Sequence, residues 1–286
     1  MDKIAEVTLK TFSIFGYQIT INPVTFLMTW LVMGLIIVFA LVVKKKLKMI
    51  PVPIQGCFEL VYEFLEDIVI STLGKKDGAK YVGLIVTLFI FVLLSNWIGI
   101  IPNIAAILGS FIGLIYSIVG SSLATISVEG LTNISLSTHP DAWFSFLFNI
   151  PAIEEPTKSV NTDLALAFVV FIVCHAFGIK QKGFIKYIRH FADDPFEMKG
   201  AWILFFFINP FFYLNIIGYI ASIVSHSFRL FGNIFGGGMI IVIVSTLLKY
   251  FLIPVGLFAF FGLFAGLVQA FVFTMLAVTY IQQQQA

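Results

Sequence analysis

The sequence has 286 residues, of which 59% are hydrophobic and only 11% are charged. Soluble domains carry roughly a quarter charged residues, so this chain lacks the polar surface of a soluble protein and is predicted to be an integral membrane protein. The formal net charge of +2 comes without a basic patch interleaved with aromatic residues, so no nucleic-acid partner is expected. Cys57 and Cys174 lack the spacing of a metal or redox site, and we expect both to be small buried hydrophobic side chains.

Long apolar stretches predict an all-α fold with about five transmembrane helices in a single polytopic domain, 1–286. About twenty apolar residues cross a bilayer, so the first three stretches are predicted to be single crossings. The fourth is too long for one upright crossing and must be strongly tilted, partly in the membrane plane, or broken near Asn209 and Pro210. A short turn makes the fourth and fifth stretches a long antiparallel helical hairpin. In chain order the stretches are 24–43, 81–101, 163–179, 201–248 and 251–281.

Lysine and arginine residues orient these helices, because cytoplasmic loops of membrane proteins carry an excess of both. Basic clusters follow the first stretch, precede the second and follow the third, whereas 102–162 carries one Lys and no Arg. The N-terminus and the loop 102–162 are therefore predicted to lie outside, and the C-terminus in the cytoplasm. The clusters are Lys44, Lys45, Lys46 and Lys48; Lys75, Lys76 and Lys80; and Lys180, Lys182, Lys186 and Arg189.

Two further segments are predicted not to cross as ordinary single spans. Residues 54–73 lie between two cytoplasmic clusters and have an acidic and an apolar face, which predicts an amphipathic interfacial helix whose acidic face meets solvent or a partner. Residues 104–126 are apolar enough to span, but a single crossing there would place 180–189 outside. An interfacial or re-entrant excursion on the outer side and a crossing paired with 142–153 both stay open. The acidic face comprises Glu59, Glu63, Glu66 and Asp67.

Arg229 lies deep inside the fourth apolar stretch, at least twenty residues from Lys199 and Lys249. Twenty helical residues span about 30 Å, so Arg229 is too far from a membrane surface to snorkel. A guanidinium near the bilayer centre costs roughly 3 kcal/mol on insertion scales. Segments 201–248 and 251–286 contain no Asp or Glu, so the counter-charge has to come from elsewhere in the chain or from another protein. We interpret Arg229 as a residue that acts in ion movement.

Two polar stripes on the hairpin are predicted to face each other, because lipid cannot satisfy polar groups. At 100° per residue, the polar and small residues of the fourth stretch fall within a stripe about 100° wide. The last stretch carries a narrower stripe, and glycines on both permit close backbone approach. His226 and Gln269 are open to a packing or a functional role. The first stripe comprises Asn215, Gly218, Ser222, Ser225, His226, Arg229, Asn233 and Gly236, and the second Gly262, Gly266, Gln269, Phe273 and Tyr280.

Four motifs resemble those of one protein family. The run S-H-S-F-R-L-F-G-N-I-F-G-G, which begins at Ser225, is similar to the signature of subunit a of the membrane sector of bacterial F-type ATP synthases. N-T-D-L-A-L-A from Asn161, H-A-F-G-I-K-Q-K-G from His175 and Q-A-F-V-F from Gln269 are similar to three further motifs of that family. The resemblance covers most of the chain, with the exception of about 104–153.

The resemblance implies a non-catalytic stator subunit in the bacterial inner (plasma) membrane, without cofactor or metal. Its implied partners are a ring of c subunits, each with a carboxylate in mid-membrane, the b-subunit peripheral stalk, the rest of the synthase and membrane lipid. Arg229 would attract each carboxylate, favour its ionised form and block leakage between two offset half-channels. Asn233 and Gln269 would support Arg229. Proton translocation coupled to ATP synthesis is expected, with Na⁺ as the alternative ion.

Departures from the family pattern affect mainly the outer half-channel. Gly238 and Gly262 stand where many relatives have a titratable pair, so we predict that Asp163 with a glycine-lined water cavity replaces it. An unrelated secondary transporter would show internal repeats, and the sequence has no such repeat. Other departures are Asn215 for an acid, Ile223 for a proline and Ser159 for an aspartate. The predicted ion-translocation residues are Arg229, Asn233, Gln269, His226, Ser225, Ser222, Asn215 and Asp163.

Overall fold

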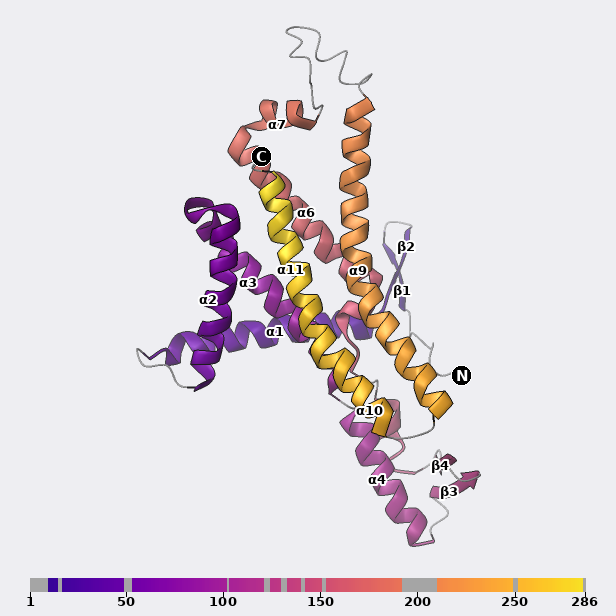
Figure 1. The fold of residues 1–286 in the computed structure, drawn as a ribbon. Helices are drawn as coiled ribbons and strands as arrows, with labels where there is room; N and C mark the ends of the chain where they lie inside the picture. Colours follow the sequence, from indigo (N-terminus) through magenta and orange to yellow (C-terminus); the bar gives the residue numbers. More distant parts are fainter. Residues whose placement is uncertain are drawn as a thin grey trace.

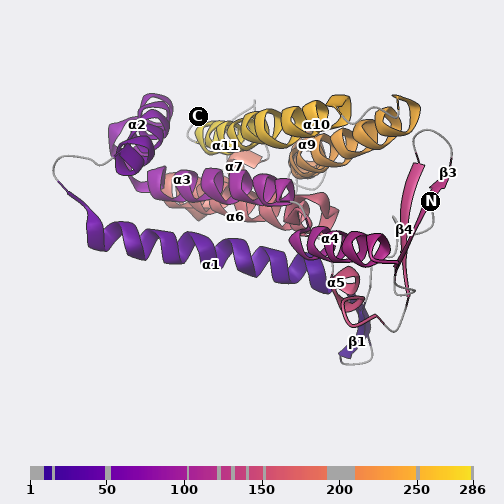
Figure 2. The ribbon, with the colours of Figure 1, turned by 90° about the horizontal axis from the view of Figure 1, so that it is seen from below.

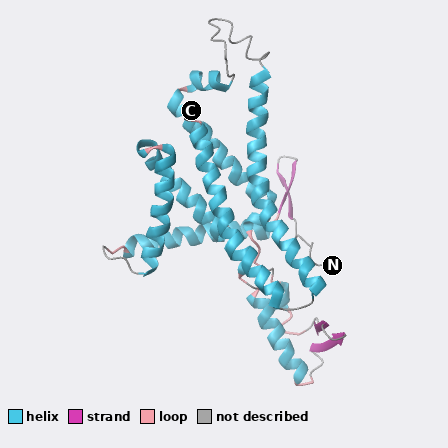
Figure 3. Cartoon of the chain, viewed as in Figure 1, coloured by secondary structure: helices cyan, strands magenta, loops and turns pink. Residues whose placement is uncertain are grey.

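The chain folds into long helices with short connecting elements (Figure 3). Five helices are long and apolar enough to cross a membrane, which confirms the predicted all-α membrane fold. Two short antiparallel hairpins are additions that the sequence pattern does not predict: β1 (Lys10–Ile14) with β2 (Tyr17–Ile21), and β3 (Ala124–Glu129) with β4 (Asn133–Thr138). The computed structural model describes residues 10–14, 17–48, 53–101, 103–120, 124–129, 133–139, 142–150, 153–191, 210–248 and 252–284.

Three apolar helices are α1 (Pro23–Lys46), α3 (Lys75–Trp97) and α6 (Val160–Lys182); α3 contacts α1, and α3 and α6 overlap in Figure 2. Each has 23 or 24 residues. At 1.5 Å per residue this is about 35 Å, enough to cross a hydrocarbon core of about 30 Å. Asn22 caps the start of α1, because its side-chain oxygen accepts a hydrogen bond from the Val24 N–H at 3.0 Å.

Helix α2 (Pro53–Leu73) is an amphipathic helix that runs across the direction of α1 (Figure 1). Its buried residues Leu65, Val69 and Leu73 belong to the main hydrophobic core together with side chains of α3. The acidic side chains of Glu63 and Asp67 are exposed. One face of α2 therefore packs on the bundle and leaves acidic groups on the other.

The C-terminal half of the chain forms the predicted long helical hairpin. Its first arm is α9 (Pro210–Leu248), and its second arm consists of α10 (Leu252–Ala259), the π-helical segment η4 (Phe260–Ala265) and α11 (Gly266–Gln283). The 39 residues of α9 span about 58 Å, nearly twice the hydrocarbon thickness, and α1 runs across the direction of both arms in Figure 1. A strongly tilted and a partly in-plane course both fit α9, which is continuous from Pro210 onward. The predicted first part of this stretch, 201–209, lies outside the described residues.

The region 102–162 forms short elements beyond one end of the bundle (Figures 1 and 2). Helix α4 (Ile104–Ile118) packs on the short helix α5 (Phe146–Asn149), around a small cluster that contains the buried Phe144. The 15 residues of α4 span about 22 Å, which is too short for an upright crossing. This geometry favours an interfacial or re-entrant excursion on the outer side over a crossing paired with 142–153. The 3₁₀ turns η2 (Ile98–Ile100) and η3 (Pro156–Lys158) connect this region to α3 and α6.

The two ends of the bundle differ in polarity. At the basic end, the Gln181 amide of α6 donates to Asp77 of α3 at 2.9 Å, and Lys80 pairs with the same carboxylate at 2.7 Å. Helix α7 (Phe184–Phe191) follows α6 at this end, after Gly183 with its positive φ of 78°. At the other end, the Thr157 hydroxyl of η3 donates to the Asn96 side-chain oxygen of α3 at 2.8 Å. The basic clusters of α3 and α6 therefore share one end of the bundle.

Two packing expectations are corrected by the structure. Cys57 is exposed on α2, because the amphipathic helix leaves that face uncovered, whereas Cys174 is buried as expected. The glycines of the last helix approach α3 and η2: a Cβ at Gly262 would lie 2.7 Å from Ile100 Cγ1, and one at Gly266 would lie 3.2 Å from Asn96 Cβ. On α9, Gly237 makes the close approach to the second arm, where an added Cβ would lie 2.9 Å from the Phe261 ring.

The arrangement of α2 predicts which loops share a membrane face. In a variant without Cys57 and Cys174, single cysteines that replace Lys45, Lys76 and Ile185 should react with an impermeant maleimide from the same face. A cysteine that replaces Ser135 should react only from the opposite face. Reaction of the first two positions from opposite faces would mean that α2 crosses the membrane.

Candidate functional site

Arg229 lies on an exposed flank of α9, together with Ser225 and Phe228. Among the described residues no carboxylate pairs with its guanidinium. The ion pair that the described residues contain joins Lys80 to Asp77 on α3. The exposed flank of a membrane helix meets lipid or another protein, and lipid tails cannot neutralise a charge. The flank of Arg229 is therefore a surface that requires a counter-charge from a partner.

His226, three residues before Arg229, lies about 60° away from it around α9, on the side that meets the second arm. Its side chain is 2% exposed, and its ring stacks on Phe273 of α11 with 3.9 Å between ring centroids. The Tyr280 ring meets it edge-on at 5.6 Å. Neither imidazole nitrogen has a hydrogen-bond partner among the described residues. The polar stripe of α9 therefore extends from the contact with the second arm, at His226, to an exposed edge at Arg229 and Ser225.

Asn233, one helical turn after Arg229, connects α9 to the π-helical segment of the second arm. Its side-chain nitrogen donates to the Ala265 carbonyl at 3.3 Å. Two side chains of α3 bind neighbouring carbonyls: Asn96 donates to Gly266 at 3.0 Å and Trp97 donates to Leu263 at 3.2 Å. A π-helical turn alters the regular backbone hydrogen bonding of a helix, and such turns are frequent at functional sites. Side chains from both neighbouring helices thus hold the irregular turn beside Asn233 in place.

Five buried polar side chains on four different helices have nitrogen or oxygen atoms without a hydrogen-bond partner among the described residues. Such atoms are rare in folded proteins and indicate water, an ion or a missing partner. In a membrane they mark positions where ions or water enter the protein interior. The five are Ser95 on α3, Asp163 on α6, His226 and Ser227 on α9, and Gln269 on α11.

Asp163 is the acidic member of this group and is 0% exposed in the first turn of α6. Both of its carboxylate oxygens lack a partner among the described residues. The two glycines expected beside it differ in their surroundings, because Gly262 packs on Ile100 whereas a Cβ at Gly238 would meet nothing within 4 Å. The structure therefore supports Asp163 as a buried acid, without placing a cavity lined by both glycines around it.

The remaining predicted site residues lie on the first half of α9 and on α11. Ser222 is half-buried and donates from its hydroxyl to the Gly218 carbonyl at 2.8 Å. Asn215 is half-buried near the start of the helix, and Gln269 is buried on α11, three residues after Gly266. The structure thus brings His226, Asn233 and Gln269 to the contact between the two arms, and leaves Ser225 and Arg229 on the outer flank.

A protein-family model described as ATP synthase A chain matches residues 26–282. The chain belongs to this family. Curated relatives are named ATP synthase subunit a. The one from Syntrophobacter fumaroxidans is 32% identical over 252 residues, which is 88% of this chain and 80% of the relative. The one from Geobacter sulfurreducens is 32% identical over 89% of this chain and 84% of the relative, and the one from Desulfosudis oleivorans is 30% identical over 95% and 93%.

Sequence reasoning missed several polar residues that the structure of this ATP synthase family member brings into the interior. Ser95, Asn96 and Trp97 follow one another at the end of α3, and Thr157 reaches Asn96 from η3. In the sequence, Ser95 and Asn96 are visible only as a polar pair near the end of an apolar stretch. Such a pair is common at an ordinary helix end, so it did not indicate a buried polar cluster. Glu155 was missed as well: it packs against Gly99, and burial raises the pKa of its carboxyl group.

Asn96 and its neighbour Ser95 form a matched pair for testing the contact with the π-helical segment. Asn96→Leu removes the bond to Gly266 and leaves the Thr157 hydroxyl unpaired, so it should lower the free energy of unfolding by about 1–3 kcal/mol. Ser95→Ala removes a hydroxyl that has no partner among the described residues and should leave the free energy of unfolding unchanged. The thermal unfolding of the purified protein in detergent measures both. An equal loss in the two variants would contradict the importance of this contact.

Proposed function

We propose that this multi-pass membrane protein is the ion-translocating, non-catalytic stator subunit of an F-type ATP synthase. Its family membership supports this role within the membrane sector of the complex. The observation that carries the proposal is the exposed position of Arg229 on a long apolar helix, without a carboxylate partner among the described residues. The proposed partner is a rotating ring of c subunits, each of which brings one carboxylate to this flank.

Arg229 acts in this proposal on the ring carboxylates as they pass. A positive charge within about 4–6 Å favours the ionised form of a carboxylate, so the bound proton leaves as the carboxylate arrives. The same positive charge repels a cation that would otherwise pass directly between the two half-channels. An ion therefore has to travel with the ring. Each charge that crosses 100 mV releases about 2.3 kcal/mol, which the ring delivers to the catalytic part of the synthase.

Polar groups of α6 and α9 supply the two half-channels in this proposal. The basic end of the bundle lies in the cytoplasm of a bacterial cell and the N-terminus lies outside, in keeping with the positions of the lysines. Asp163, in the first turn of α6, then belongs to the outer half-channel. Ser222, Ser225 and Asn215 precede Arg229 on α9 and belong to the inner one. Asn233 and Gln269 hold the contact between the two arms next to Arg229.

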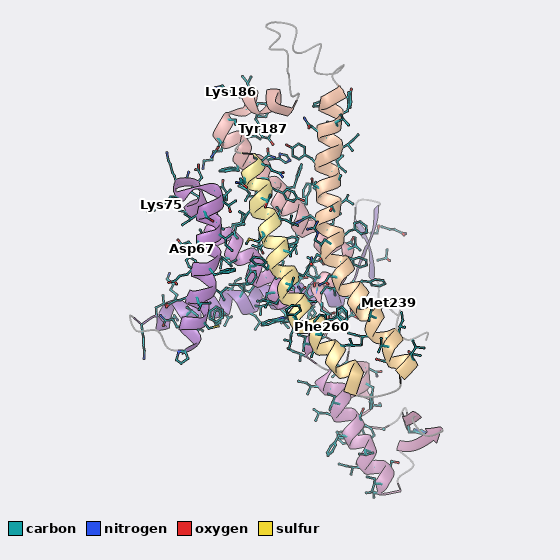
Figure 4. All side chains as sticks on the ribbon, viewed as in Figure 1. Asp67, Lys75, Lys186, Tyr187, Met239 and Phe260 are labelled. Carbon is teal, nitrogen blue, oxygen red and sulfur yellow. The ribbon has the colours of Figure 1, made fainter. Side chains whose placement is uncertain are left out.

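The cytoplasmic face offers the surface for the stationary partners. Exposed Asp67 on α2 and exposed Lys75 at the start of α3 lie on neighbouring elements (Figure 4). The b-subunit peripheral stalk is the proposed partner on this face, where it holds the subunit against the torque of the ring. The exposed apolar side chains of α1 face membrane lipid.

Arg229 variants test the proposed function directly. Arg229→Ala should lower ATP-driven ion pumping in inverted membrane vesicles at least ~100-fold while the complex still assembles, because the ring carboxylate loses its counter-charge. Arg229→Lys should also be severely impaired, since an ammonium group lacks the planar fork of the guanidinium. Lys186→Ala removes a positive charge on the exposed surface of α7 and serves as the control with normal pumping. Normal pumping in Arg229→Ala would refute the proposal.

The coupling ion is proposed to be the proton, which is the default in this family, with Na⁺ as the alternative; the described residues offer Asp163 as a buried acid in its path. ATP hydrolysis by the purified complex should then be unchanged by millimolar Na⁺, and an uncoupler should collapse ATP-driven pumping. Hydrolysis stimulated several-fold by Na⁺ would assign sodium as the ion. The role of Arg229 would be the same in either case, since it acts on the ring carboxylate.

A further inference from the structure

A broad apolar surface lies on α4, at the end of the bundle opposite to the basic clusters. Six large apolar side chains of this helix are 46–74% exposed, and at 100° per residue they fall within an arc about 100° wide. The segment 104–128 contains no charged residue. A continuous exposed apolar surface of this kind marks contact with a membrane or with another protein. The six residues are Ile104, Ile107, Leu108, Phe111, Ile115 and Ile118.

The opposite side of α4 is closely packed. A Cβ at Gly109 would lie 3.0 Å from the Phe148 ring of α5, so the glycine lets the two helices approach. The Tyr116 ring of α4 stacks on the buried Phe144 ring, with 5.6 Å between the ring centroids. Helix α4 is therefore fixed on one side by its own segment of the chain, and its exposed face is a stable surface.

The β3–β4 hairpin adds polar residues to this segment. Its register places Ser127 opposite Ser135 and Glu129 opposite Asn133. Residues directly opposite each other in an antiparallel pair share a face, so the hairpin has one polar face. Helix α4 contacts both strands. We call α4, α5 and this hairpin, residues 104–150, the outer module, which combines an apolar helix with a polar hairpin.

Short connections hold the outer module at the end of the membrane-spanning α3. The chain from Ile100, at the end of η2, to Ile104 can reach at most about 14 Å. The Asn103 side-chain nitrogen donates to the Ile150 carbonyl at 3.1 Å, which ties the two ends of the module together. The start of α4 therefore cannot lie far from the membrane surface. Ile101, in the connection, is 45% exposed and continues the apolar surface from α3 to α4.

The direction of α4 and its aromatic neighbours indicate how the helix lies. It runs across the direction of α1 in Figure 1, as expected for a helix that follows the membrane surface. Trp143 is 62% exposed, and its Nε1–H donates to the Tyr116 hydroxyl at 3.3 Å. Tryptophan and tyrosine are enriched where hydrocarbon meets the headgroups, because each ring has an apolar body and a polar atom. This pair therefore marks the depth of the module.

We propose that the outer module is a lipid anchor, in which the exposed face of α4 lies among the acyl chains of phospholipids in the nearer leaflet. Lipid is the occupant that the observations favour, because the face is uncharged, begins at the end of a membrane helix and continues its apolar surface. The polar face of the hairpin then meets headgroups and water. The anchor holds the end of the subunit farthest from α2 in the bilayer, a role separate from ion translocation.

A photoreactive lipid tests this contact on the native chain. The intact complex is placed in phosphatidylcholine vesicles that contain phosphatidylcholine with a diazirine in its acyl chain. After illumination, the modified peptides of the subunit are mapped by mass spectrometry. We expect lipid adducts on α4, and on α1, whose exposed apolar side chains serve as the internal positive control. Adducts on α1 without adducts on α4 would overturn the proposal.

Fluorescence quenching measures the depth of α4 and separates lipid from a protein partner. Phe111→Cys, in a Cys57→Ser and Cys174→Ser background, is labelled with a polarity-sensitive fluorophore in the reconstituted complex. Its emission should be blue-shifted, and a lipid nitroxide near the headgroup should quench it several-fold more than one at the methyl end of the chain. His139→Cys, at an exposed position after β4, is the matched control with emission typical of water.

Three outcomes of this measurement would contradict the lipid anchor. Emission typical of water at Phe111→Cys would place α4 outside the membrane. Blue-shifted emission without quenching by either nitroxide would mean that another protein, or a second copy of this chain, covers the face. Stronger quenching from the methyl end would make α4 a re-entrant helix. The pumping of Arg229 variants is unaffected by any of these results, so the lipid anchor and the proposed function fail separately.

Discussion

A guanidinium inside a hydrocarbon layer needs a counter-charge, and the described part of this chain provides none for Arg229. This constraint explains why Arg229 lies on an exposed flank of α9, where another protein can reach it. It also explains why the helix is long, since 39 residues on a strongly tilted or partly in-plane course present an extended surface within the membrane. The rest of the bundle supports that one surface from behind.

The support comes mainly from polar contacts with an irregular helix. Because the second arm contains a π-helical turn, its backbone carbonyls accept hydrogen bonds from Asn233, Asn96 and Trp97. The bond from Asn233 joins α9 to the second arm one helical turn after Arg229, and the bonds from Asn96 and Trp97 join the second arm to α3. Rigid placement matters for an electrostatic function, because the interaction of two charges changes steeply with their separation. His226, next to Arg229 around α9, adds a ring stack on Phe273 of the second arm to this support.

Hydropathy and lysine positions were sufficient to predict the five long apolar helices, and the isolated charge was sufficient to single out Arg229. Periodicity could not tell which side of a polar stripe faces a neighbour, because a stripe about 100° wide includes both Arg229 and His226. The glycine pattern predicted close approach, but only tertiary packing decides that Gly262 meets Ile100. The Cys57 side chain was misjudged for the same reason, since burial on an amphipathic helix depends on what covers it. The polar cluster around Asn96 joins segments far apart in the sequence, which no local pattern reveals.

The central claim is that the exposed Arg229 flank of α9 faces a ring of membrane carboxylates. A cryo-electron microscopy structure of the whole complex, with side chains resolved, tests it most directly. The account predicts that α9 and α11 lie against the ring and that the Arg229 guanidinium points to the level of its carboxylates. A ring bound to another face of the bundle, with Arg229 directed at lipid or at a carboxylate of this same chain, would contradict it.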